Sequence, residues 1–180
     1  MSSFNEVIAY WFEELEEDDW WKKSDSLDKH IRERFGQLHQ RAVACELCAW
    51  RAEPLGRLAE IIVLDQFSRN MFRNSAKSFA QDPQALSLAQ EAITDKADAE
   101  LDQLQRSFLY MPFMHSESGK IHEQAVELFR NNGIQSNYDF ELKHKAIIDR
   151  FGRYPHRNKL LNRTSTSEEQ QFLLQPGSSF

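Results

Sequence analysis

The chain has 180 residues, 41% of them hydrophobic and 28% charged, so it is long enough to bury one substantial core and too apolar to be disordered. A net charge of -6 gives no general electrostatic support for nucleic-acid binding. The wholly apolar runs, such as residues 7–12 and 61–64, are too short to span a bilayer, and the acidic N-terminal stretch does not resemble a signal peptide. We therefore expect one cytoplasmic domain over residues 1–180, frayed from about residue 175, with neither nucleic acid nor a membrane as its partner.

Helical signals dominate the chain, because only six glycines and five prolines interrupt it and strand patterns are nearly absent. Apolar residues at helical spacing predict seven or eight helices. In chain order they cover about residues 4–15, 25–42, 54–64, 83–93, 101–111, 119–133 and 137–151, with a short last helix that Pro176 ends. The third should be central, because residues 61–64 leave it little polar surface. The predicted fold is all-α, with antiparallel helix pairs packed in layers.

Residues with short polar side chains mark the expected helix starts. The predicted N-caps are Ser3, Ser24 or Asp25, Asp82, Ser118, Ser136 and Thr166, the last with Glu169 in a capping box. Pro112 should end or kink the fifth helix.

The two cysteines, Cys45 and Cys48, form an isolated CxxC motif. A structural zinc site needs a second pair of ligands at similar spacing, and a thioredoxin-type motif needs a βαβ unit. We therefore interpret both as small, semi-buried helix residues and predict no metal site.

Three predicted apolar stripes contain a polar residue where the period calls for a hydrophobic one. These residues are Asp65 and Arg69 in the third helix, His115 beyond the fifth, and His144 in the seventh. Buried polar groups must be satisfied, so such residues either pair with one another or line a pocket. An ion pair between Asp65 and Arg69, four residues apart, is the simplest interpretation of the first break. A lone His144 is more often a satisfied core histidine than a ligand.

The stretch "RFGRYPHRN", residues 150–158, brings three arginines, a histidine and an asparagine together. Such a basic run is often a solvated face, but a planar guanidinium also suits a carboxylate or phosphate held in fixed geometry. The candidate ligand-binding residues are Asp65, Arg69, Asn70, His115, Glu117, His144, Arg150, Arg153, His156, Arg157 and Asn158.

The stretches "LDQFSRN", "MHSES" and "RFGRYPHRN", together with "AYWFEE", resemble the bacterial family called domain of unknown function 924. The three blocks occur in the order of that family, and the similarity extends from about Phe4 to Leu174. The resemblance implies a tetratricopeptide-like helical fold and assigns no activity. It places the candidate residues in those three blocks, while Ser68 stands where the family has Pro and Cys45 where it has Gly.

The sequence supports a pocket for a small anionic ligand that bears a phosphate or a carboxylate. Its arginines are more numerous than the two visible acids, Asp65 and Glu117, although an acidic residue from another helix would balance them. The clamps would be Arg69, Arg153 and Arg157, and the candidate catalytic residues are His115, Glu117 and His156. Whether a reaction is catalysed, and with which cofactor, stays open.

Two alternatives remain. In the first, the protein is an interaction module with a protein partner, and the arginine and histidine blocks form a structural ion-pair network. In the second, weaker alternative, it is a metal-dependent hydrolase that uses His115, Glu117, His144 or His156.

Overall fold

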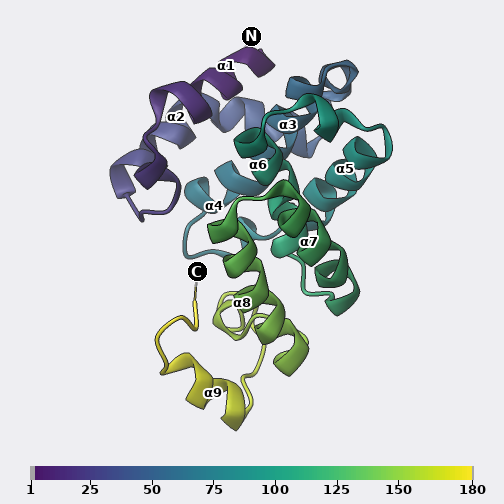
Figure 1. Ribbon diagram of the computed structural model, residues 1–180. Coiled ribbons are helices and arrows are strands. Elements are labelled where there is room, and N and C mark those ends of the chain that lie inside the picture. Colours follow the sequence, from purple (N-terminus) through teal and green to yellow (C-terminus); the bar gives the residue numbers. More distant parts are fainter. Residues whose placement is uncertain (1–2, 180) are drawn as a thin grey trace.

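The computed structural model describes residues 3–179, and every regular element within them is helical, as the sequence predicts. Figure 1 shows these helices. They are α1 (Phe4–Ala9), α2 (Asp25–Val43), α3 (Pro54–Ile62), α4 (Ser68–Met71), α5 (Asp82–Thr94), α6 (Gln103–Met114), α7 (Gly119–Asn132), α8 (Gln135–Phe151) and α9 (Ser167–Leu173). Short 3-10 and π-helical turns connect or extend several of them.

The predicted third helix is the central rod of the fold. A π-helical turn, Val63–Phe67, joins α3 to α4 without interruption, so the described helices form eight rods. Leu58, Ile61 and Ile62 are completely buried, as are the residues that begin the π turn. The predicted number of helices and the central position of the third are therefore confirmed.

Neighbouring helices pack as pairs, which confirms the predicted layers. The helix α6 packs against α7, and α7 against α8, while α1 lies on α3 and α2 on α4. The tetratricopeptide-like description of this arrangement stays a prediction.

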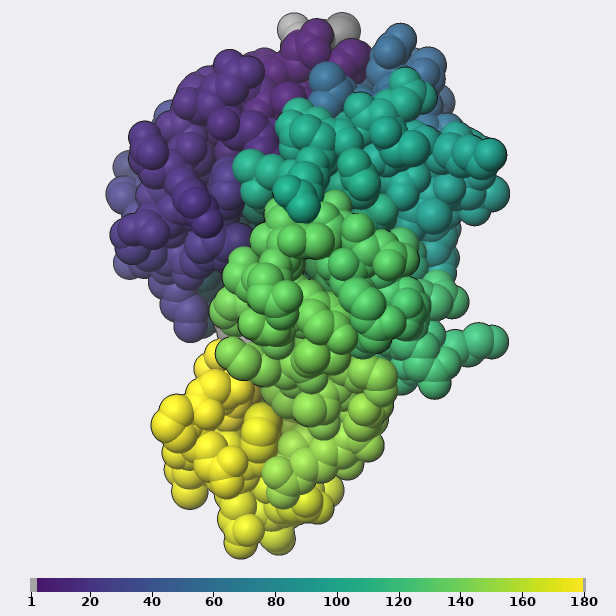
Figure 2. Space-filling view, viewed as in Figure 1, coloured from purple at the N-terminus to yellow at the C-terminus, as the bar shows by residue number. Residues whose placement is uncertain are grey.

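The buried apolar residues form two clusters. The larger one draws on α1 to α7, whereas Ile147, Ile148 and Tyr154 form a small second cluster with Phe151 and Phe172. The C-terminal residues, yellow in Figure 2, gather at one end of the molecule. They are joined to the rest mainly through α8 and the segment that follows it.

Several predicted caps are confirmed. The Ser3 side chain accepts from Glu6 N–H, the Ser24 side chain accepts from Leu27 N–H, and Thr166 forms the capping box with Glu169. Ser118 is an N-cap residue, although its side chain makes no capping hydrogen bond.

Other expectations about the helix ends were wrong. Ser136 lies inside α8, whose N-cap is Ile134, and Asp82 is the first residue of α5 rather than its cap. Pro112 does not end α6, which continues to Met114, because its last turns are buried on several sides and that packing outweighs the missing backbone hydrogen bond; the expected kink stays a prediction. Phe140, an apolar residue of α8, is 49% exposed.

The two cysteines are exposed rather than semi-buried. Cys45 follows the end of α2 with φ of 59°, a left-handed conformation that favours glycine. The positive φ at this position therefore explains why the resembled family has a Gly there.

The expected frayed tail contains a turn in which Ser178 Oγ donates to the Leu173 carbonyl at 3.2 Å, and Phe180 lies outside the described residues. Within residues 3–179, no helix is long and apolar enough to cross a membrane. The cytoplasmic location stays a prediction.

Candidate ligand-binding site

The π turn holds a fully buried carboxylate, that of Asp65. Its Oδ1 accepts from Arg69 Nη1 at 3.0 Å and lies 2.7 Å from His115 Nδ1, while its Oδ2 accepts from Gln66 Nε2 at 2.6 Å. The Asp65 backbone carbonyl also accepts from Arg69 Nη1, at 3.0 Å. The structure thus confirms the ion pair between Asp65 and Arg69, and it adds His115 from the end of α6.

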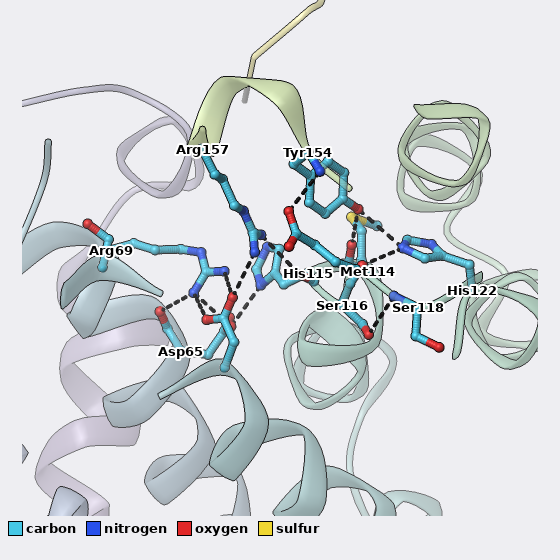
Figure 3. Close-up of polar contacts among 12 residues, drawn as sticks. Asp65, Arg69, Met114, His115, Ser116, Ser118, His122, Tyr154 and Arg157 are labelled. Atoms are coloured by element: carbon cyan, nitrogen blue, oxygen red, sulfur yellow. Dashed lines mark hydrogen bonds and ion pairs between the residues drawn. The ribbon is translucent and has the colours of Figure 1, made fainter. Parts of the chain in front are cut away.

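A second carboxylate, Asp82 at the start of α5, extends this network. Arg69 donates to both of its oxygens, at 2.9 and 3.0 Å. Arg157, in the 3-10 turn Pro155–Arg157, donates to Asp82 Oδ2 at 3.2 Å and to the His115 carbonyl at 3.0 Å. Figure 3 shows Arg69, Arg157 and His115 converging near Asp65 from separate elements. Four segments that are far apart in the sequence therefore meet here.

Electrostatics fix the protonation states in this network. Burial acts to raise the pKa of Asp65, but Arg69 and His115 outweigh it and lower that pKa. Burial, and next the Arg69 charge, lower the pKa of His115, so its imidazole is neutral near pH 7. Its Nδ1 then donates to Asp65, which leaves a lone pair on Nε2.

A pocket of about 400 Å³ lies beside the network. Its walls come from the start of α5 with the turn before it, from the end of α6, and from the C-terminal segment. The lining residues are Ala76, Phe79, Ala80, Asp82, Pro83, Leu86, Pro112, His115, Ser116, Glu117, Arg157 and Leu161. Three candidate residues, His115, Glu117 and Arg157, thus line one cavity.

Glu117 is held in place at the edge of this pocket. It accepts two hydrogen bonds from Arg163, at 2.6 and 2.9 Å, and one from the Tyr154 N–H at 2.8 Å. Burial acts to raise the pKa of Glu117, yet the hydrogen bonds from Arg163 and Tyr154 lower it overall. Glu117 is therefore ionised at neutral pH and anchors the C-terminal segment.

Arg157 differs from the other arginines of the network. It is 6% exposed, and within residues 3–179 its buried Nε has no hydrogen-bond partner. Burial, and next the charge of Arg69, lower its pKa, whereas the pKa of Arg69 is raised, because Asp65 and Asp82 outweigh burial there. The charge of Arg157 is thus the less completely compensated of the two.

The remaining arginines of the basic stretch lie elsewhere. Arg150 pairs with Glu168 at 2.8 Å, and Arg153 contacts both oxygens of Glu169, at 2.6 and 2.8 Å. Both contacts attach α9 to the end of α8. The apparent excess of arginine over acid in this stretch therefore largely disappears, since each arginine contacts a carboxylate.

Two candidate asparagines also serve the scaffold. Asn70 donates to Asp28 on α2 at 2.9 Å. Asn158 is 1% exposed, donates to Ser165 Oγ at 3.0 Å and accepts from Arg163 Nε at 2.9 Å, so it shapes the loop before α9.

The candidate histidines His144 and His156 pack around Tyr154, with ring centroids 5.7 and 5.6 Å from that of the tyrosine. Burial lowers their pKa values to about 3 and about 4, respectively. His144 Nδ1 also lies 2.8 Å from the Phe140 carbonyl. Both histidines are therefore neutral at physiological pH.

A second polar cluster escaped the sequence reasoning. His122 and Glu141 are completely buried, with Nδ1 and Oε1 2.7 Å apart, and His122 Nε2 lies 2.8 Å from the Ser116 carbonyl and 3.2 Å from Tyr154 Oη. Burial raises the pKa of Glu141. Their helical spacing from buried apolar residues was a usable signal, since His122 is seven residues before Phe129.

Asp82 and Arg163 were missed for different reasons. Asp82 before Pro83 has the pattern of an ordinary helix cap, and its partners are 13 and 75 residues away. Arg163 follows the recognised stretch by five residues and carried no periodic signal.

Within residues 3–179, no group of three or more His, Cys, Asp or Glu side chains is placed so that it could hold a metal ion.

The fold and the site define a class of layered helical protein with a small pocket beside a buried network of arginine, aspartate and histidine. The family model described as a bacterial protein of unknown function (DUF924) matches residues 7–177, and the chain belongs to this family. A solved structure, a protein of unknown function, ATU0120, from Agrobacterium tumefaciens, is similar at 35% identity with a TM-score of 0.90. The match covers 94% of this chain and 96% of that one. No curated protein matches.

Proposed function

We propose that this protein binds a small ligand with a carboxylate or phosphate group in the pocket lined by Arg157 and His115. The observation that carries the proposal is the incomplete compensation of Arg157, a nearly buried guanidinium at the wall of a cavity of about 400 Å³. Among residues 3–179 its hydrogen-bonded carboxylate partner is Asp82, which already accepts two shorter hydrogen bonds from Arg69. A buried guanidinium gains most from a charge-assisted pair, so an anion in this pocket supplies what Asp82 supplies only in part.

His115 supports the same proposal. With Nδ1 donating to Asp65, its neutral ring presents Nε2 as an acceptor for a hydroxyl or a protonated acid group of the ligand. The Asp65 carboxylate holds the His115 ring in one orientation, and Arg69 holds that carboxylate. Arg69 therefore acts behind the pocket wall, whereas Arg157 is the anion-binding side chain.

The test is a thermal-shift titration with inorganic phosphate, sugar phosphates, nucleotides and organic acids. Binding to the native state raises the apparent stability by mass action, so at least one of these anions should raise the melting temperature saturably. The shift should disappear in Arg157→Gln and persist in Arg153→Gln, a matched control from the same stretch whose side chain pairs with Glu169. No shift with any of these anions, or equal shifts in both variants, would contradict the proposal.

A second candidate function is that of an interaction module, in which the arginine block is purely structural. It is favoured by the contacts of Arg150 and Arg153 with α9, which hold the end of the chain on the fold. Affinity purification with the wild-type chain should then recover a stoichiometric protein partner, and Arg153→Ala should lower the stability. If neither is observed, this candidate is contradicted.

A further inference from the structure

The pocket beside Arg157 combines a short polar edge with a larger apolar wall. Five of its twelve lining residues are polar, and the other seven are apolar. The largest apolar members are Phe79, Leu86 and Leu161. A ligand that contacts the whole pocket therefore presents hydrocarbon to most of it and a charged group to one side only.

The charges around the polar edge sum to zero. Asp65, Asp82 and Glu117 are balanced by Arg69, Arg157 and Arg163, which pair with them, and His115 is neutral. A phosphate monoester brings close to two negative charges near pH 7, next to the two carboxylates of the wall. A monoanion needs only the one incompletely compensated guanidinium, so the charge balance favours a single negative charge.

The orientation of Arg157 also favours a planar anion. Its guanidinium carbon lies 4.5 Å from the Phe79 ring centroid and 4.6 Å from that of Tyr154. These two aromatic contacts, with the hydrogen bonds to Asp82 and the His115 carbonyl, fix the guanidinium plane. A planar carboxylate can lie in that plane and accept a charge-assisted hydrogen bond from the guanidinium.

We infer that the ligand is a monocarboxylate on an apolar body, with its carboxylate at Arg157 and its hydrocarbon against Phe79, Leu86 and Leu161. This inference rests on the proposed function, because it names the chemical class of the ligand for the same pocket. The apolar wall supplies affinity through buried hydrocarbon, whereas Arg157 selects the charged group.

Isothermal titration calorimetry on the full chain tests this with four probes: acetate, hexanoate, the neutral analogue hexanamide, and inorganic phosphate. Hexanoate should bind at least tenfold more tightly than each of the other three. Arg157→Gln should weaken hexanoate binding at least tenfold, to the level of hexanamide. Leu161→Ser should reduce the preference for hexanoate over acetate severalfold, while Leu142→Ser, a substitution on the exposed surface of α8, should leave it unchanged.

The outcomes separate this inference from the proposed function. If phosphate binds more tightly than hexanoate and requires Arg157, the monocarboxylate inference is overturned and the anion site stands. Equal affinity for acetate and hexanoate overturns the role of the apolar wall in the same way. If none of the four probes, and none of the wider panel of anions, binds the folded wild type, both proposals fall.

Discussion

Asp82 accepts hydrogen bonds from two arginines, and its side chain is only 13% exposed. The change Asp82→Asn keeps the shape of the side chain and removes the negative charge that Arg69 and Arg157 share. Breaking a buried ion pair by neutralising one partner leaves an uncompensated charge, so the free energy of unfolding should fall by about 3 kcal/mol. Urea denaturation of the variant and the wild type measures this difference.

The control for Asp82→Asn is Asp149→Asn on α8. Asp149 pairs with Lys145 four residues away and is 53% exposed, so its loss should change the unfolding free energy by less than about 1 kcal/mol. In Asp82→Asn the freed guanidiniums should bind a carboxylate more tightly, and hexanoate should restore part of the lost stability. Equal effects of the two substitutions would contradict the central position assigned to Asp82.

The sequence predicted single residues where a periodic stripe was broken. Asp65, Arg69 and His115 were found in this way, and the Asp65 carboxylate contacts both of the others. Asp82 could not be found, because a carboxylate before a proline at a helix start looks the same whether it caps the helix or binds a distant arginine. The role of Asp82 depends on the position of Arg157, which lies 75 residues later in the chain.

At the scale of elements, one carboxylate both caps α9 and attaches it to the end of α8. Glu169 belongs to the capping box of α9 and also accepts from Arg153. The hydrogen bond from Arg153 lowers the pKa of Glu169 to about 2. Because this pKa lies below its unfolded value, the stabilisation is present above about pH 4.5 and is lost as the pH falls toward 2.

We therefore expect α9 to detach from α8 as the pH falls from about 4.5 to 2. In Glu169→Gln it should detach already at neutral pH, without this pH dependence. Hydrogen exchange of the α9 amides at several pH values measures the detachment. The matched control is Glu168→Gln, because Glu168 is 61% exposed in its pair with Arg150, and its loss should leave α9 protected. Equal protection of the α9 amides in both variants would contradict the role of Glu169 in attaching α9 to α8.

The periodicity of apolar residues predicted which segments form helices, but it did not predict how each residue is rotated around its helix axis. The predicted third helix was correct in position, yet its π turn at Val63–Phe67 could not be anticipated. One extra residue in a helical turn rotates everything after it around the axis, and no local preference signals it. The same holds for Pro112, where burial of the surrounding side chains outweighed the local signal to stop.

At the scale of the whole molecule, the pocket lies where the C-terminal segment meets the main core. Arg157 and Leu161 come from that segment, whereas Pro112 and His115 come from α6, which belongs to the larger cluster, and Phe79 from the turn before α5. The sequence analysis found His115 and Arg157 in two separate stretches, "MHSES" and "RFGRYPHRN". Their meeting depends on the packing of α6, α7 and α8, which sets the direction in which the chain returns.

Four histidines whose pKa is lowered by burial give the whole molecule a further property. Burial lowers the pKa values of His39, His115, His144 and His156 in the folded state. An unfolded chain binds protons at these positions near pH 6.5, whereas the folded chain resists them until about pH 4 for His156 and about pH 3 for His144. The unfolded state thus binds more protons between these values, so stability falls as the pH falls.

We therefore expect the free energy of unfolding to be highest above about pH 6.5 and to decrease steadily toward pH 4. Each histidine that stays neutral contributes up to about 1.4 kcal/mol per pH unit to this slope. In His144→Asn, whose amide can still donate to the Phe140 carbonyl, the slope should be smaller by one proton. Urea denaturation between pH 7.5 and 4.5 measures these slopes. A slope that is flat in the wild type, or equal in the wild type and His144→Asn, would show that buried neutral histidines do not set the acid sensitivity of this fold.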